Sequence, residues 1–392
     1  MGTYWGFITT AMPFLLRKQG IPIDQIASIS ALTGIAQVVY VLWSPIVDMG
    51  ITRRAWVLLL SLVSALMLLV AILLPLPRCL AAYAALLALG NAVNTSTSIA
   101  SGGLMAVLMP PPDHGKAGGW YQAGNLGGAA LAGGICIWLS EVVSLRALAV
   151  IAAAMVFIPS LAVFAVHEPE RDLTPNPALF RQMFHKLREL MRQRATWVGF
   201  LFFLSPIGAA ALNTLFSGLG VDYRAPSQMV VWVTGFGGAV FTSLGSVAGG
   251  FVCDRMDRRS AYMVSGGLSA VVSGAMMMLP LSPMVFAVGA SAYLVAAGFC
   301  YAAYNALALE LTEGEPCTGG TRFSLFAAAA NVPVAYMTWL DGQGSRLWGI
   351  RGLMGTDTAG NVLGIVALGL GLRWSLRRRT AVPAAAPEPS DA

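Results

Sequence analysis

The sequence predicts an all-α membrane protein in which about twelve spanning helices form two pseudo-symmetric six-helix bundles. Three observations predict this fold class. Of the 392 residues, 57% are hydrophobic and only 11% are charged, so a water-soluble globule would lack the polar residues to cover its surface. Apolar runs long enough to cross a bilayer, about 20 residues each, recur along the chain. Short sequence patterns also return after about half of the chain, which indicates a duplicated domain.

The apolar runs fall six and six around one polar segment, residues 167–195. Several runs contain Gly and Pro, which membrane helices tolerate better than soluble ones. The first run has only fifteen residues before Arg17. That is too short for roughly 30 Å of hydrocarbon, so we expect the true start of the protein to lie upstream. The predicted spans are 2–16, 25–47, 55–75, 80–109, 117–140, 145–166, 196–218, 228–252, 260–280, 284–311, 321–341 and 357–376.

These spans predict an N-terminal bundle over 1–166, a linker over 167–195, a C-terminal bundle over 196–379 and a disordered, low-complexity tail over 380–392. Within the linker, residues 178–195 separate apolar from basic side chains at helical spacing, which predicts an amphipathic helix lying on the membrane. A solvated linker with accidental periodicity is the alternative. The apolar face would hold Phe180, Met183, Phe184, Leu187, Leu190 and Met191, and the basic face Arg181, Lys186, Arg188, Arg192 and Arg194.

Lys and Arg predict the orientation in the membrane. If both termini are cytoplasmic, 17 of the 24 Lys and Arg residues lie on the inner side and seven on the outer side. An excess of positive charge on the inner side is typical of multi-pass membrane proteins. We therefore expect a protein of the inner (cytoplasmic) membrane with both termini inside.

Composition and motifs also limit the function. The net charge of +6 is spread in short clusters between apolar runs, so no nucleic-acid partner is predicted. The five Cys are odd in number and never in CxxC spacing, which predicts neither a disulfide framework nor a zinc site. Neither HExxH nor GxSxG occurs, so we expect no catalytic residues, no cofactor and no enzyme. A receptor or scaffold with the fold of a transporter is the alternative to a transporter.

The duplicated pattern is SPIVDMGITRR, residues 44–54, which returns in altered form as GFVCDRMDRR, residues 250–259. Asp48 and Asp254 are 206 residues apart, and each follows an apolar run and precedes an Arg pair. The fifth and eleventh spans give the same offset, because Asn125 and Asn331 are also 206 residues apart. Two independent landmarks with one offset indicate two halves of parallel repeat, an arrangement found in secondary transporters.

These loops resemble the cytoplasmic loop pattern of the major facilitator superfamily, G-x-x-x-D-(R/K)-x-G-x-(R/K)-(R/K). The second copy fits much of the pattern, whereas the first fits a contracted form, with Ser44 in place of the leading Gly and Met49 in place of the Arg after Asp. The resemblance covers nearly the whole chain and implies the major facilitator fold and a monomeric secondary transporter of a small solute. Simple positive-inside anchoring would explain the Arg residues but not the Asp residues. The gating residues implied are Asp48, Arg53, Arg54, Asp254, Arg255, Arg258 and Arg259.

Two further stretches are similar to one branch of that superfamily. They are PFLLRKQGIPIDQIA followed by LWSPIVD, and TRFSLFAAAANVP in the eleventh span. The branch holds AmpG-type muropeptide permeases, acetyl-CoA transporters and siderophore importers. The spans carry no Lys or Arg near their middle to bind a polyanion, so acetyl-CoA ranks last. The branch therefore implies import of a muropeptide-like or other sugar-bearing solute, with a siderophore as the alternative.

Polar residues inside spans are costly, so they indicate either a binding site or hydrogen bonds between helices. Here they are amides, hydroxyls and aromatic rings, which suit a neutral or sugar-bearing solute. Polar residues of this kind include Gln37 and Tyr40 in the second span. The candidates for solute binding are Asn94, Thr97, Ser98, Trp120, Tyr121, Gln122, Asn125, Tyr301, Tyr304, Asn305, Asn331 and Tyr336.

Coupling to protons requires a carboxylate whose proton affinity changes with burial. Two carboxylates are candidates: Glu310 near the cytoplasmic end of the tenth span, and Asp341 at the outer end of the eleventh. For each, a charge at a helix end with no part in coupling is the alternative.

Overall fold

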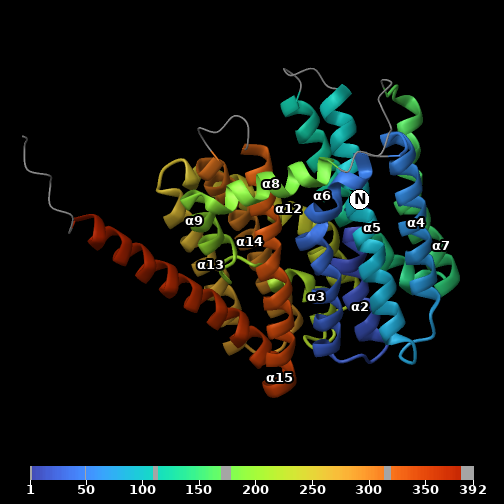
Figure 1. Cartoon of the computed structure of the whole chain (residues 1–392). Coiled ribbons are helices and arrows are strands. Elements are labelled where there is room, and N and C mark those ends of the chain that lie inside the picture. The colour runs from blue at the N-terminus through green and yellow to red at the C-terminus, as the bar shows by residue number, and fades with distance from the viewer. Residues whose placement is uncertain (1, 49, 109–113, 169–177, 313–318, 381–392) are drawn as a thin grey trace, which may run out of the picture.

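The computed structural model describes residues 2–48, 50–108, 114–168, 178–312 and 319–380, and every regular element within these ranges is a helix (Figure 1). By length and composition, six helices of the described residues could cross a membrane, and Ile23–Val39 and Gly127–Val142 are shorter apolar helices. Large hydrophobic side chains point outward from the bundle, such as Val271, which is 70% exposed, and Leu363, which is 66% exposed. A hydrophobic exterior of this extent suits lipid rather than water.

The first six spans form the N-terminal half of the bundle. All six predicted spans agree with the structure to within three residues at each end. The second span changes from α-helix to a tighter 3₁₀ helix in its last third. The elements are α1 Gly2–Gly6, η1 Phe7–Ala11 and α2 Met12–Lys18 in the first span, then α3 Ile23–Val39 with η2 Tyr40–Asp48, α4 Arg53–Leu73, α5 Leu80–Leu108, α6 His114–Val142, and α7 Leu145–Phe157 with η4 Ile158–Ala165.

The last six spans form the C-terminal half. Its seventh span is broken into short helices, and its eighth contains a π-helical segment, η6. The last two spans join in one long element, α15. The elements are α9 Arg194–Phe203, η5 Ala211–Thr214 and α10 Phe216–Leu219, then α11 Ser227–Val230 with η6 Val231–Phe236 and α12 Gly237–Cys253, α13 Arg258–Met278, α14 Pro283–Thr312, and α15 Gly319–Thr380.

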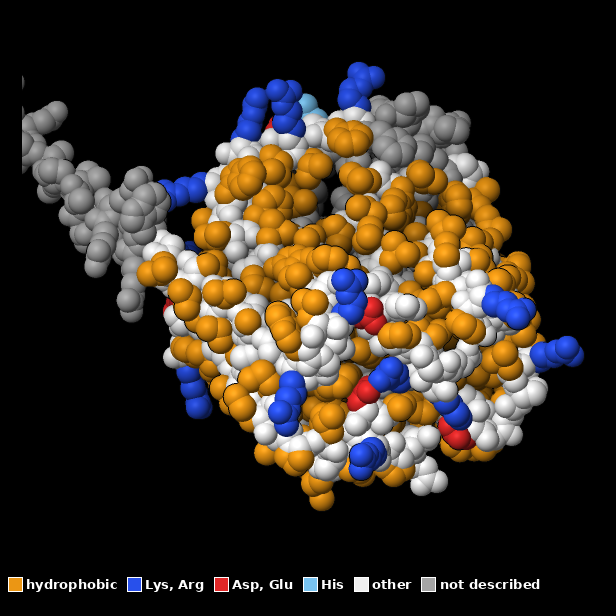
Figure 2. Space-filling model, turned by 90° about the horizontal axis from the view of Figure 1, so that it is seen from below, with side chains coloured by type: hydrophobic (Ala, Val, Ile, Leu, Met, Phe, Trp, Pro, Cys, Tyr) orange, Lys and Arg blue, Asp and Glu red, His pale blue; other side chains and the backbone are white. Residues whose placement is uncertain are grey.

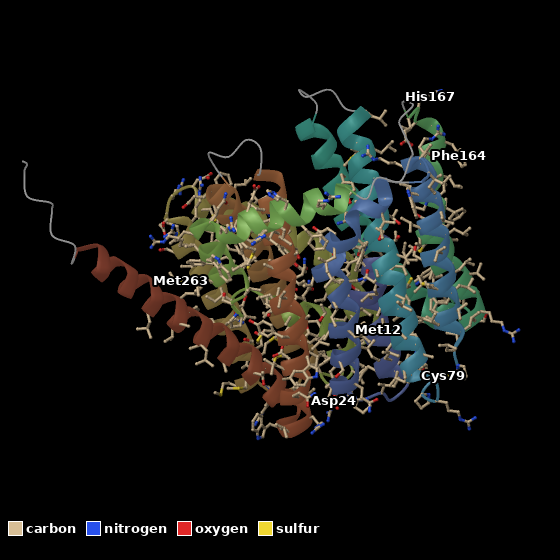
Figure 3. All side chains as sticks on the ribbon, in the orientation of Figure 1. Met12, Asp24, Cys79, Phe164, His167 and Met263 are labelled. Atoms are coloured by element: carbon tan, nitrogen blue, oxygen red, sulfur yellow. The ribbon has the colours of Figure 1, made fainter. Side chains whose placement is uncertain are left out.

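The spans run between two ends of the bundle, which we call lower and upper from their positions in Figure 1. The lower end carries the turns 19–22, 74–79 and 220–226, and the upper end carries the starts of α4 and α13. Figure 3 shows Asp24 and Cys79 at the lower end and Phe164 and His167 at the upper end.

The end of the eleventh span differs from the prediction. The helix does not stop at Asp341 but continues to a kink at Trp348 and Gly349, and the twelfth span starts directly afterwards instead of at Asp357. Gly349 has φ +65°, which explains the sharp reversal there. Gly342 and Gly344, which suggest a helix end in the sequence, instead allow close helix packing. Asp341 is therefore inside a helix and fully buried.

The seventh span unwinds between Leu204 and Ala210, a feature that the sequence analysis does not predict. Gly208 and Ala210 have positive φ, 64° and 50°. Side chains of the same half satisfy the freed backbone groups, as a bundle interior requires. Tyr262 donates to the Ile207 carbonyl at 3.0 Å, and Asn361 accepts from the Gly208 N–H at 3.1 Å.

The predicted amphipathic helix is present as α8, Ala178–Arg192, and lies across the upper end (Figure 1). It ends three residues before the predicted boundary. Leu190 is buried, and the Trp197 indole donates to the Met191 carbonyl at 2.8 Å, which fixes the end of α8 against α9. Phe184 is 54% exposed, so part of the apolar face is free to meet another surface. The side chains of Phe180, Met183 and Lys186, and the predicted disordered tail after Thr380, lie outside the described residues.

Candidate functional site

Much of the polar face of α5 forms hydrogen bonds to neighbouring helices. The Asn91 amide donates to the Thr33 carbonyl of α3 at 2.8 Å, and the Trp43 indole donates to Ser96 Oγ at 3.0 Å. These bonds join helices of the N-terminal half, the alternative role that polar residues in spans often have. They leave fewer groups of this face for a solute.

Three hydroxyl-bearing rings lie near one another, two from the N-terminal half and one from the C-terminal half. Ser98 of α5 is hydrogen-bonded to the Tyr121 hydroxyl of α6. Tyr40 of η2 is close enough to both Tyr121 and Tyr304 for electrostatic interaction. Tyr304 belongs to α14 in the C-terminal half, so the cluster draws on both halves. We call Tyr40, Tyr121 and Tyr304 the tyrosine cluster. Two of its members are predicted candidates for solute binding.

The edge of α14 next to this cluster adds two more predicted residues. Tyr301 is 46% exposed although it lies in the middle of a spanning helix. Asn305, one turn further along, is also exposed, and its amide donates to the Tyr301 carbonyl at 2.8 Å. Its side-chain oxygen is thus oriented away from its own helix. Exposed amides and phenols are suitable partners for the hydroxyl groups of a solute.

Other predicted candidates support the protein itself. The Tyr336 hydroxyl donates to the Leu204 carbonyl at 2.9 Å and so stabilises the unwound part of the seventh span. The Asn331 amide donates to the Ala327 carbonyl of its own helix at 2.8 Å. Asn125 packs where α1 approaches α6 through a glycine, and its Oδ1 is buried without a hydrogen-bond partner in the described part of the chain.

The remaining candidates are less accessible. Asn94 and Thr97 are 1% and 5% exposed, so neither side chain is accessible to a solute in this conformation. Trp120 and Gln122 belong to α6, but their side chains lie outside the described residues.

At the upper end, the predicted gating residues of the first copy make contacts inside the N-terminal half. The Glu168 carboxylate accepts from the backbone N–H groups of Arg53 and Arg54, both at 3.0 Å. A carboxylate at this position caps the start of α4, where N–H groups have no partner within the helix. Arg53 Nη1 also donates to the Gly103 carbonyl of α5 at 3.0 Å.

The second copy of the repeated loop pattern, residues 250–259, also makes a contact inside its own half, the C-terminal one. Arg258, at the start of α13, lies 3.5 Å from Glu310 in α14. This ion pair places Glu310, a predicted coupling residue, at a helix end beside a cation. Of the other predicted gating residues, Asp254 and Arg255 are exposed, Arg259 is partly buried, and the side chain of Asp48 lies outside the described residues.

At the lower end, an ion pair joins the two halves. Arg17 of α2 contacts Asp222, in the turn after α10, through both carboxylate oxygens, and Arg17 Nε is 3.1 Å from Oδ2. A paired contact of a guanidinium with a carboxylate is among the stronger ion pairs. Lys18 and Glu141, 2.7 Å apart, form a second pair within the N-terminal half. Figure 2 looks onto this end and shows basic side chains beside acidic ones on a largely hydrophobic face.

Glycines bring the halves into close contact at the same end. A Cβ on Gly342 of α15 would lie 2.5 Å from the Ala27 Cβ of α3. A Cβ on Gly235 of η6 would lie 2.7 Å from the Gly134 Cα of α6. Distances below 3.0 Å leave no room for any other residue. We call these two helix contacts, together with Arg17 and Asp222, the lower seal.

The C-terminal half buries a second carboxylate, Asp357, which is not among the predicted site residues, near the predicted Asp341. Asp341 is 0% and Asp357 1% exposed, and the two interact electrostatically. The sequence does contain a signal for Asp357, because Asn361 follows it by one helical turn inside an apolar run. The predicted twelfth span begins at Asp357, so at this position the sequence predicts a charge at the end of a loop and not one inside the membrane.

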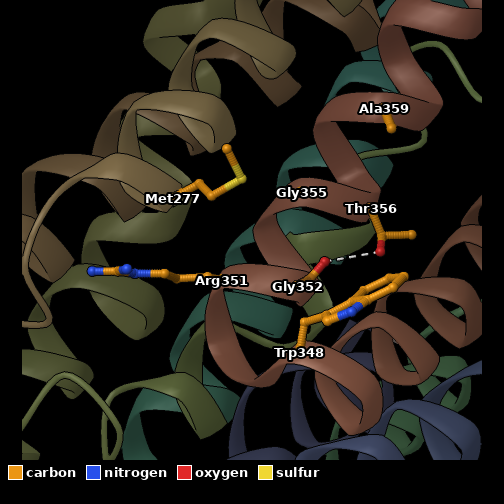
Figure 4. Close-up of a pocket in the computed structure, with 7 residues that line it drawn as sticks. All are labelled: Met277, Trp348, Arg351, Gly352, Gly355, Thr356 and Ala359. Atoms are coloured by element: carbon orange, nitrogen blue, oxygen red, sulfur yellow. Dashed lines mark hydrogen bonds between the residues drawn. The ribbon is translucent and has the colours of Figure 1, made fainter.

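A separate groove lies on the side of the C-terminal half, between α13 and the start of the twelfth span (Figure 4). Its volume is about 430 Å³, and it is open and mostly apolar. In Figure 4, Trp348 lies beside Gly352 and Thr356, and Arg351 extends away from them. The lining contains none of the predicted solute residues. Among the described residues, no three His, Cys, Asp or Glu side chains come together as metal ligands.

Comparison with known proteins agrees with this architecture. The profile of the Major Facilitator Superfamily matches residues 1–338. A bacterial homologue of the human lysosomal transporter Spinster, in an inward-facing and unoccupied conformation, is similar with a TM-score of 0.66 at 15% identity, over 93% of this chain and 90% of that one. The nucleoside transporter NupG is similar with a TM-score of 0.68 at 13% identity, over 93% and 94%, and a point mutant of it reaches 0.70 at 14% identity, over 93% and 95%. The chain therefore belongs to the major facilitator superfamily, and it is a multi-pass membrane transporter of a small solute, not an enzyme.

Proposed function

We propose that this transporter imports a muropeptide-like or other sugar-bearing solute across the inner membrane. The observation that carries the proposal is the tyrosine cluster, which draws on both halves, with Tyr301 and Asn305 beside it. Phenol rings stack on sugar rings, and hydroxyls and amides bond to sugar hydroxyl groups. NupG is a nucleoside transporter, and a nucleoside also bears a sugar. At such low identity that likeness supports the fold alone.

We place the upper end in the cytoplasm, with both termini on that side. The distribution of Lys and Arg favours this orientation. The lower seal would then close the outer side, and the solute would leave towards the cytoplasm. In alternating access, the seal must open and the upper end must close to complete the cycle.

We further propose that import is driven by protons. Of the two predicted coupling residues, Asp341 is favoured because it is fully buried, whereas Glu310 has Arg258 as an ion-pair partner. Burial without a counter-ion makes the charge of a carboxylate costly, which is the property that a proton-coupling group requires.

Uptake into proteoliposomes tests the proposal. Radiolabelled anhydro-muropeptide, a nucleoside and a ferric siderophore are each offered with and without an inward proton gradient. We expect the gradient to drive accumulation of the muropeptide. Tyr301→Phe should lower this uptake about 3- to 10-fold, because the exposed phenol of Tyr301 loses one hydrogen bond to the solute. Tyr83→Phe is the matched control, since Tyr83 is buried in the core of the N-terminal half.

Three outcomes would contradict the proposal in different ways. Accumulation of the siderophore but not of the muropeptide would exclude the solute class. Equal accumulation with and without the gradient would exclude proton coupling. Equal losses in Tyr301→Phe and Tyr83→Phe would exclude the edge of α14 beside the tyrosine cluster as part of the binding surface.

A further inference from the structure

The C-terminal half buries two carboxylates where neither has a basic partner. Asp341 and Asp357 lie on the two arms of α15, on either side of the kink at Trp348 and Gly349. They are 0% and 1% exposed, and within the described ranges no Lys or Arg forms an ion pair with either. Two negative charges held together away from water repel each other and lose their hydration. Such a pair calls for a bound positive charge.

The two carboxylates differ in their hydrogen bonds. Asp357 Oδ1 accepts from the Tyr293 hydroxyl of α14 at 2.9 Å, and the Asn361 amide lies 3.5 Å from Oδ2. Asp341 has two buried oxygens, and neither has a hydrogen-bond partner in the part of the chain that the structure describes. A buried acceptor without a partner requires an explanation. A proton on Asp341 would supply one, since it removes the charge and provides a donor.

The surroundings contribute few other titratable groups. From α14 comes Tyr293, and from α3 comes Asp24, whose backbone lies against Gly342. The nearby η5 and α13 contribute hydroxyls: Thr214 is 3.5 Å from Thr338, and Ser273 is 2.8 Å from Thr358. Arg346 and Arg351 are on α15 itself, but both are exposed.

The pair is also next to the lower seal. Gly342 follows Asp341 directly and packs against Ala27 of the other half. A charge on Asp341 would therefore develop beside a dry contact between the halves, and water entering to solvate it would separate α3 from α15. A neutral Asp341 is compatible with the closed contact.

We infer that Asp341 and Asp357 form a proton-binding site inside the C-terminal half, apart from the tyrosine cluster, and that one proton held there keeps the lower seal closed. Binding converts the Asp341 carboxylate to a neutral carboxylic acid, which removes the repulsion between its charge and that of Asp357. Release returns the proton to water and leaves two charges beside α3. Tyr293 is a positioning residue that holds Asp357 towards its partner. The coupling role of this site rests on the proposed transport function.

Infrared difference spectroscopy of the full-length protein in lipid nanodiscs tests the site without any solute. Spectra at neutral and alkaline pH should differ by the C=O band of one buried carboxylic acid. Asp341→Asn should abolish the band, because Asp357 then has no like charge beside it and keeps the donors Tyr293 and Asn361. Glu310→Gln, which alters a partly exposed ion pair, is the control and should leave the band in place. A band that persists unchanged in Asp341→Asn, or is absent from the unmodified protein, would overturn the inference.

Tyr293→Phe tests the positioning role. It removes the donor to Asp357, which destabilises the ionised form, so the midpoint of the pH titration of the band should rise by about one pH unit. An unchanged midpoint would show that Tyr293 has only a packing role.

A sodium site is the alternative explanation of two buried carboxylates. If sodium raises the melting temperature of the unmodified protein but not of Asp341→Asn, and no carboxylic acid band is present, the proton assignment is wrong.

The transport assay separates this inference from the proposed function. Asp341→Asn should lose gradient-driven accumulation and keep solute exchange. Full accumulation in Asp341→Asn would refute the coupling role even if the band is lost. An unmodified protein that transports none of the three solutes, yet shows the band and loses it in Asp341→Asn, would refute the solute class while supporting the proton site. Equal melting temperatures of the variants confirm that they are folded.

Discussion

At the lower end, Arg17 of one half pairs with Asp222 of the other, whereas at the upper end Arg258 pairs with Glu310 inside a single half. The glycines show the same contrast. Gly342 and Gly235 touch the opposite half at the lower end, while Gly124 and Gly250, towards the upper end, have nothing within 4 Å. The lower end thus carries contacts between the halves, and the charged contacts described at the upper end hold each half together.

The difference between the two ends indicates which contacts can change when the transporter switches access. Contacts between halves must break when access switches, whereas contacts within a half can persist through the whole cycle. Substitutions in the lower seal should therefore change the balance between access states. Substitutions at the upper end should change the stability of one half.

The largest effect is expected from Gly342→Ala. The new Cβ would lie 2.5 Å from the Ala27 Cβ, so α3 and α15 must separate. Overpacking of this kind costs about 1–3 kcal/mol, which corresponds to roughly 5- to 150-fold in the balance between states. A cysteine at Ala31, in the same contact face of α3, should then react with maleimide at least about tenfold faster.

Gly34→Ala is the matched control in the same pair of helices. Its Cβ would lie 3.9 Å from the Ala335 Cβ, an ordinary contact, so labelling at position 31 should stay nearly unchanged. Similar acceleration by both substitutions would mean that any added methyl group loosens the helices, and the comparison between tight and loose positions would fail.

A smaller effect is expected from Arg17→Gln. This substitution removes a charged contact between the halves, which is worth about 1 kcal/mol because both side chains are partly exposed and solvent screens their attraction. Spin labels at Gln19 and Arg224, both exposed at the lower end, should show a larger share of long distances by pulsed electron paramagnetic resonance. Asp222→Asn should act alike, and the double variant should add little to either.

Lys18→Gln is the control, since Lys18 pairs with Glu141 of its own half and is 49% exposed. It should leave the distance distribution as it is. A shift as large as that of Arg17→Gln would show that the net charge of the lower end matters, not the particular pair that joins the halves.

The fold could be predicted from the sequence because each spanning helix is a continuous apolar run of about 20 residues, which is visible within that segment alone. The ninth span, predicted over 260–280, is the helix Arg258–Met278, and the amphipathic pattern of the linker is the helix α8. The prediction misses the unwound part of the seventh span, and it is wrong at the end of the eleventh. Gly342 and Gly344 look like helix breakers, yet small residues in a membrane helix also permit close packing.

The candidate site was predictable in part. Tyr121 and Tyr304 are recognisable because polar residues are expensive inside spans. That both lie near Tyr40 could not be predicted. The ion pair of Arg17 with Asp222 could not be predicted either, because the two residues are 205 positions apart in the sequence. No local pattern records which residues of two distant helices meet. The same holds for Asp341 and Asp357, which become a pair only through the kink at Gly349.

The smallest effect is expected from Glu310→Gln at the upper end. The Arg258 and Glu310 side chains are 40% and 33% exposed, so solvent screens their attraction, and the pair contributes at most about 1 kcal/mol to stability. We expect a slightly lower melting temperature and no change in the lower-end distances between Gln19 and Arg224. Arg258→Gln should behave in the same way, because either substitution breaks a contact inside one half. If Glu310→Gln instead lengthens the lower-end distances as Arg17→Gln does, the two ends are coupled, and the division between contacts that switch and contacts that persist would have to be abandoned.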